Sequence, residues 1–213
     1  MPANAIGGNR LLCSRRVARA CFCTLQNCLL TETGKIIEAI LTEDLAIQWD
    51  VAIEFAVLEG LFPVWFEEPF RKISSQLVEL AELVPSAAEV GFHFCYGDSG
   101  NKHFKEPEDM GLLVNLANQL CREAERRTDW IHLPVPIARN DADYFRPLRE
   151  LDRDNLEHLY LGLFHEQDGV EGANKRMAAA NSFATDYGLA TECGLGRRKP
   201  EIIQDLLELH ASI

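Results

Sequence analysis

The chain has 213 residues, of which 47% are hydrophobic and 25% charged, a composition typical of a folded globular protein. With 21 basic and 33 acidic side chains, its formal net charge is −12. This charge argues against nucleic acid as a partner, because phosphate binding needs a basic face. No run approaches the roughly 20 apolar residues of a membrane helix, so we expect no membrane partner.

The first 31 residues differ in composition from the rest of the chain. They contain four arginines, no acidic residue and four of the seven cysteines: Cys13, Cys21, Cys23 and Cys28. We expect a basic, poorly ordered leader over 1–31 and a domain over 32–213. A mitochondrial presequence and a metal knot are the alternatives, although the cysteine spacing matches no standard zinc pattern. No secretory signal is evident, so we expect reduced thiols and a cytoplasmic location.

From residue 35 onward, strand-like and helix-like segments alternate. The helices are expected over 36–41, 70–83, 107–127, 172–183 and 200–210, and the strands over 45–55, 89–96, 130–135, 159–165 and 187–193. Such alternation predicts βαβ units with a parallel sheet. The nearly continuous apolar strands favour a sheet that is covered on both faces. The sequence therefore predicts an α/β fold with about five parallel strand–helix units.

Titratable residues gather at the ends of the expected strands, where α/β sheets and barrels build their sites. His93 and Cys95 are two residues apart, so both side chains point to one face of a strand. An imidazole and a thiolate suit an ion such as zinc, although strands also bury both residue types for packing alone. Cys193 can supply a second thiolate if its strand lines the same barrel. Gly194 and Gly196 then permit a close backbone approach or a positive φ.

Three stretches resemble the C-terminal catalytic barrel of cobalamin-independent methionine synthase and its smaller relatives. They are IQWD (47–50), HFCY (93–96) and ECGLGRR (192–198), and they occur in the family's order. The resemblance implies a TIM-type (β/α)₈ barrel in which His93, Cys95 and Cys193 bind zinc. It further implies that zinc activates a thiol substrate, that Asp50 holds the substrate's amino group, and that a folate donates the methyl group.

Two family positions differ in this chain. The further zinc ligand of the family is a Glu, and Pro134 stands there, so we consider His132 or Glu192 as the substitute ligand. The family's catalytic His is also replaced, by Gln167, and we assign its role to the neighbouring His165 and Asp168. These differences favour a divergent relative over a true methionine synthase.

Several candidate residues have a second interpretation. Asp50 either binds substrate or forms an ion pair with Arg197 or Arg198. The basic run 197–199 either binds an anion, such as a polyglutamate tail, or is a solvated turn. We assign Glu192 and Arg197 to substrate binding, whereas we expect His103 to be an exposed loop residue.

Five strand–helix units in about 180 residues fall short of the eight in a closed (β/α)₈ barrel. We therefore expect an incomplete barrel, with two open strand edges through which the protein self-associates or binds a partner. Three functions stay open: a zinc-dependent methyl transfer to a small thiol, a metal-free relative acting on another small molecule as a decarboxylase or lyase, and an inactive barrel.

Overall fold

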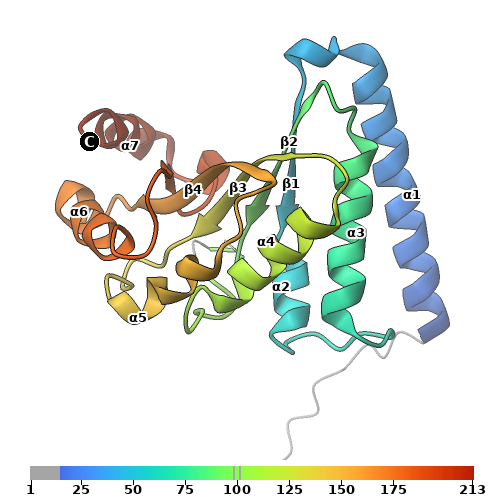
Figure 1. Ribbon diagram of the computed structural model, residues 1–213, viewed down its shortest axis with the longest axis horizontal. Coiled ribbons are helices and arrows are strands. Elements are labelled where there is room, and N and C mark those ends of the chain that lie inside the picture. Colours follow the sequence, from blue (N-terminus) through green and yellow to red (C-terminus); the bar gives the residue numbers. More distant parts are fainter. Residues whose placement is uncertain (1–14, 98, 101) are drawn as a thin grey trace, which may run out of the picture.

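The computed structural model describes residues 15–97, 99–100 and 102–213 and confirms an α/β fold with one parallel sheet (Figure 1). The sheet is made of five strands: β1 (Ala46–Val51), β2 (Glu89–Phe94), β3 (Thr128–Pro134), β4 (Leu156–Phe164) and β5 (Gly188–Thr191). Their order in space is their order in the sequence, and all four pairings are parallel. Among the described residues the sheet does not close, so β1 and β5 are its edges.

The helices lie between the strands: α1 (Arg15–Ala39), α2 (Ile53–Leu58), α3 (Pro69–Leu83), α4 (Gly111–Glu123), α5 (Ala142–Phe145), α6 (Gly169–Ala180) and α7 (Pro200–Ala211). Each strand lies beside the previous one, so right-handed crossovers place the connecting helices on one face of the sheet. This is the winding of a barrel, whereas a doubly wound sheet reverses direction.

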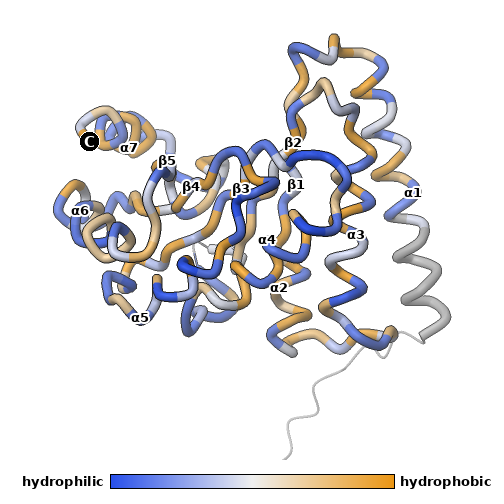
Figure 2. The backbone as a smooth tube through the Cα atoms, viewed as in Figure 1, coloured by the Kyte–Doolittle hydropathy of each residue, from blue (hydrophilic) through white to orange (hydrophobic). Residues whose placement is uncertain are grey.

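The two faces of the sheet differ, so the expectation of a sheet covered on both faces is wrong. Val90, Phe92 and Phe94 of β2 point to the helices and are fully buried. On the opposite face, Gln48 and Asp50 of β1 are exposed. In residues 15–97, 99–100 and 102–213, helices cover only the first face, which leaves an open inner face with polar side chains. Figure 2 shows hydrophobic and hydrophilic stretches alternating along α3, as expected for a helix that covers one side of a sheet.

Several element boundaries differ from those predicted, and three of these differences lie near the ends of strands or helices that border the site. The strand expected over 45–55 ends at Val51, and α2 begins two residues later and buries Phe55. A continuous apolar run does not distinguish a strand from a buried helix, which explains the error. The helix expected from residue 107 begins at Gly111, whose amide donates to Asp109 Oδ1 at 2.7 Å. β5 spans only Gly188–Thr191, so Cys193 follows the strand.

The N-terminal part has one long helix. α1 runs from Arg15 to Ala39 and so crosses the boundary expected at residue 31. Residues 1–14, including Cys13, lie outside the described residues, whereas Cys28 is an exposed free thiol. The division at residue 31 stays a prediction. In the part of the chain that is described, no helix has the length and apolarity needed to cross a membrane.

Candidate metal centre

His93, Cys95 and Cys193 meet on the inner face of the sheet, with their ligand atoms within 4.8 Å of one another. His93 lies near the end of β2, Cys95 follows that strand, and Cys193 follows β5. In a flat sheet β2 and β5 would lie about 14 Å apart, since neighbouring strands are about 4.8 Å apart. The sheet must therefore curve to bring these side chains together.

A glycine in β4 lets the chain after β5 approach closely. A Cβ atom added to Gly162 would lie 2.6 Å from the Cα atom of Glu192 and 3.1 Å from Nε2 of His132. The backbone of residue 192 thus lies against the inner face of β4 at a point where no side chain fits. Cys193 follows at once and reaches His93. The glycines expected to need special geometry, Gly194 and Gly196, have neither a positive φ nor a neighbour within 4 Å of an added Cβ.

The distances within the group match those in a tetrahedral zinc site. Cys95 Sγ and Cys193 Sγ are 3.7 Å apart, and Cys193 Sγ lies 3.4 Å from His93 Nε2. Zinc bonds of about 2.3 Å to sulfur and about 2.0 Å to nitrogen put tetrahedral ligands about 3.8 Å (S to S) and about 3.5 Å (S to N) apart. A disulfide would need about 2.05 Å. The three ligand atoms are therefore spaced for a metal ion, with a fourth position for water or substrate.

The surroundings of Cys193 favour its thiolate, the form that binds metals. Its hydrogen bond with Cys95 has the largest effect on its pKa, burial opposes this effect, and contact with His93 lowers the pKa further, to about 4. The buried Cys121 thiol, on α4, shows the opposite effect, because desolvation raises its pKa to about 11. The surroundings of Cys193 therefore favour the metal-binding thiolate, whereas those of Cys121 disfavour it.

His132 supports the centre without being one of the three grouped ligands. Its ring stacks on His93 with centroids 4.7 Å apart, and the two Nδ1 atoms are 2.6 Å apart. Burial, and then the charge of His93, lower the pKa of His132 to about 3, so this ring is neutral at physiological pH. Metal-binding histidines ordinarily have their second ring nitrogen held by a partner. His132 is in place to hold Nδ1 of His93 while Nε2 faces the metal position.

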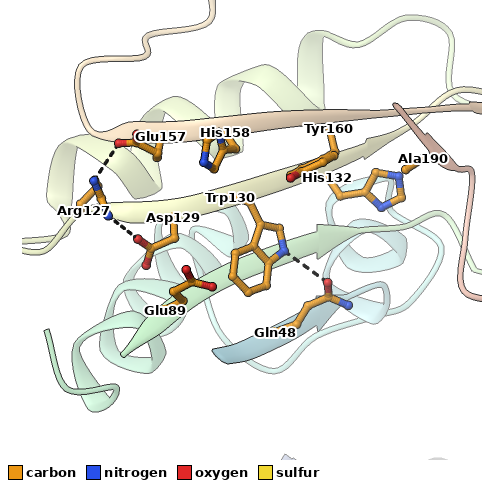
Figure 3. Close-up of a pocket in the computed structure, with 10 residues that line it drawn as sticks. All are labelled: Gln48, Glu89, Arg127, Asp129, Trp130, His132, Glu157, His158, Tyr160 and Ala190. Atoms are coloured by element: carbon orange, nitrogen blue, oxygen red, sulfur yellow. Dashed lines mark hydrogen bonds and ion pairs between the residues drawn. The ribbon is translucent and has the colours of Figure 1, made fainter. Parts of the chain in front are cut away.

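The inner face continues below the centre as a cavity of about 550 Å³ (Figure 3). The Trp130 indole lies across it and donates to Gln48 Oε1 at 3.3 Å, in the space left by Gly91. Arg127 bonds Asp129 and Glu157 near the starts of the strands. His132 also lines this cavity, so its side chain lies on the inner face of the sheet.

Glu192 is held by two histidines and lies outside the metal group. Its Oε1 is 3.2 Å from His103 Nε2, and its Oε2 is 3.7 Å from His165 Nδ1. The His103 side chain is only 9% exposed, so the expectation of an exposed loop residue is wrong. Although burial opposes protonation, hydrogen bonds and charges of Glu192 and Glu106 raise the pKa of His103 to about 9. No sequence pattern indicated this contact, because it depends on a loop folding over the site.

His165 and Asp168 have different surroundings. The His165 ring is buried and donates from Nε2 to the carbonyl of Val135 at 2.8 Å; burial lowers its pKa, so it is neutral. Asp168 forms a two-bond ion pair with the buried Arg176, at 2.6 and 2.8 Å. The structure thus places His165 beside Glu192, whereas Asp168 holds an arginine.

Asp50 and Arg197 both line a second cavity. This cavity, of about 490 Å³, is also lined by His93 and Cys193. Asp50 accepts a hydrogen bond from Gln48 at 3.0 Å. The lining thus combines a carboxylate and a guanidinium with two of the three possible metal ligands.

Comparisons of this chain with protein-family models, curated proteins and solved structures gave no match. The fold and the His/Cys/Cys group therefore rest on the chain itself.

Proposed function

We propose that the protein is a zinc-dependent enzyme that activates a small thiol and transfers a methyl group to it, as a divergent relative of the cobalamin-independent methionine synthase barrel. The observation that carries this proposal is the spacing of His93, Cys95 and Cys193, which leaves one tetrahedral position open. Catalytic zinc sites have three protein ligands and such an open position.

A bound zinc ion would supply Lewis acidity that keeps a substrate thiol as its thiolate at neutral pH. The protein's own groups bind and orient the reactants. Asp50 takes a substrate ammonium group and Arg197 a carboxylate, since both line the cavity that leads to Cys193. In the transfer, the bond between the methyl carbon and its donor breaks as the S–C bond forms.

The donor must leave with a proton, and the thiol proton must go to a base. His165 and Glu192 lie 3.7 Å apart beside Cys193 and are the groups in place to hold that proton. The catalytic role expected for Asp168 stays a prediction. In the structure its carboxylate forms an ion pair with Arg176. A reduced folate is the donor that the family resemblance suggests.

The direct test is zinc quantitation on the purified full chain. We expect about one zinc ion per chain in the wild type, and its loss in His93→Ala and Cys193→Ser. Cys28→Ser is the matched control, because Cys28 is an exposed thiol on α1 and its loss should leave the zinc content unchanged.

Less than about a tenth of an equivalent of zinc in the gently purified wild type would contradict the proposal and favour a metal-free relative. Retention of full zinc in Cys193→Ser would show that the ligand set is wrong. With zinc established, homocysteine and other small thiols are tested for methylation by 5-methyltetrahydrofolate, with product measured by mass spectrometry. If no thiol gives a methylated product, the protein has a metal centre but not the proposed activity.

A further inference from the structure

A third cavity, of about 600 Å³, opens on the other side of the metal centre. It lies between the loop that carries His103, the segment from Pro136 to Arg139, and residues 192–198. Its lining shares only Cys193 with the lining of the cavity that contains Asp50. Cys193 thus stands between two separate openings, an arrangement suited to two reactants that meet at one atom.

Arg198 lines this third cavity and is largely buried. Its side chain is 11% exposed, and its Nε atom, like Nε of Arg139 in the same lining, is buried without a hydrogen-bond partner among the described residues. The nearest carboxylate oxygen, of Glu166, is 4.0 Å from Nη1, too far for a hydrogen bond. A guanidinium removed from water normally has its donors satisfied, because an unmatched buried charge is costly. Within the part of the chain that the structure describes, Arg198 therefore lacks a close anionic partner.

The other charged groups of the cavity already have partners. Arg139 pairs with Asp141 at 3.2 Å and lies over the Tyr144 ring, while Glu192 contacts His103 and His165. The remaining cation of the lining, Lys102, is exposed. Among the described residues, Arg139 and Glu192 thus have closer charged partners than Arg198, whose ion pair with Glu166 spans 4.0 Å.

We propose that this third cavity binds an anionic group, a carboxylate or a phosphate, of the second reactant, with Arg198 as its anchor. This inference rests on the proposed function for the role of the occupant, but the anion site itself does not depend on a metal ion. The thiol then approaches Cys193 from the Asp50 side and the anionic reactant from the Arg198 side.

The first test measures anion binding by the full chain as purified, using isothermal calorimetry with inorganic phosphate and, separately, acetate at constant ionic strength. We expect saturable binding of at least one of them, and Arg198→Gln to weaken it about tenfold or more, the usual effect of losing a charged hydrogen bond. Stronger binding of phosphate or of acetate identifies the anion class.

One matched variant accompanies Arg198→Gln. Lys199→Gln removes the same charge from the exposed neighbour and should retain the affinity for the anion. Equal losses in the two variants would mean general charge attraction, and that result overturns the inference. Absence of saturable binding to the wild type overturns it as well.

The second test asks whether the two cavities are separate. In protein loaded with cobalt, binding of 2-mercaptoethanol is followed by the sulfur-to-cobalt absorption band, with and without saturating anion. We expect the thiol affinity to change less than about twofold if the anion sits beside Arg198. Direct competition would place the anion in the thiol cavity and overturn the inference. Failure to bind metal would contradict the proposed function alone, since the anion titration needs no metal.

Discussion

At the residue scale, the stacked pair of His93 and His132 decides how a metal ion would be held. A ligating imidazole needs one nitrogen facing the metal and the other fixed by a partner. With Nε2 of His93 facing Cys193 at 3.4 Å and Nδ1 facing His132 at 2.6 Å, both conditions are met. His132 Nδ1 then accepts a hydrogen bond from Nδ1–H of His93, and the His132 ring is neutral.

We expect His132→Leu to lower zinc affinity by roughly tenfold to a hundredfold, because it removes the acceptor for Nδ1 of His93. His132→Asn keeps an oxygen acceptor near the same position and should recover most of the affinity. Competition with a chromogenic zinc chelator measures both variants. Equal losses in the two would indicate a packing defect instead of a lost hydrogen bond.

The ion pair of Asp168 and Arg176 makes a second prediction at this scale. Arg176 is 1% exposed and also donates to the carbonyls of Leu163 and Ile137. Hydrogen bonds from Arg176, though opposed by partial burial, lower the pKa of Asp168 below its ordinary value of 3.8. The stabilisation is therefore present above pH 3.8 and is lost as the pH falls through the lower pKa of the folded state.

At pH 7 we expect Asp168→Asn to reduce the free energy of unfolding by about 2–3 kcal/mol, because it leaves a buried arginine without its counter-charge. Urea unfolding of wild type and variant at pH 7 and pH 3 should show the difference shrinking at the lower pH. Zinc content should not change. If the loss of unfolding free energy in Asp168→Asn is the same at pH 7 and pH 3, the charge of the carboxylate is not what stabilises the fold.

At the scale of secondary structure, the segment that follows β5 determines where the second thiolate lies. β5 is only four residues long, and the chain beyond it approaches the inner face of β4 at Gly162. That approach is what places Cys193 opposite β2.

We expect Gly162→Ala to destabilise the fold by about 1–3 kcal/mol and to weaken zinc binding, because the new methyl group overlaps the backbone of Glu192. Gly194→Ala is the control, since φ there is −61° and an added Cβ meets nothing within 4 Å. Thermal melting and zinc competition measure both variants. Full zinc affinity in Gly162→Ala would show that the chain after β5 can shift without moving Cys193.

The elements themselves were largely predictable from the sequence. The helix expected over 70–83 is observed as Pro69–Leu83, because Ile73, Leu77 and Ala81 recur at helical spacing and are buried. The start of α4 was not predictable, because it depends on two hydrogen bonds. The amide of Gly111 donates to the Asp109 side chain, and the amide of Met110 donates to the carbonyl of Tyr144.

At the scale of the whole molecule, the open sheet suggests self-association. Among the described residues β1 and β5 are edges, and unpaired strand edges are sites at which chains pair. We expect sedimentation velocity to show a dimer whose fraction increases with protein concentration. Ala46→Lys, at an exposed position of β1, should weaken that dimer if this edge is used. A single monomeric species at all concentrations would contradict the prediction.

The sequence by itself determined the strand–helix alternation, the parallel sheet, and the pairing of His93 with Cys95, since these follow from local periodicity and from two-residue spacing on a strand. Only the tertiary structure decided that Cys193, which follows a strand three places away in the sheet, comes within 3.7 Å of Cys95. It also decided the contact of His103 with Glu192 and the burial of Arg198. The physical reason is curvature: the bend of the sheet and the path of the loops over it depend on the packing of the whole chain, which no short stretch of residues specifies.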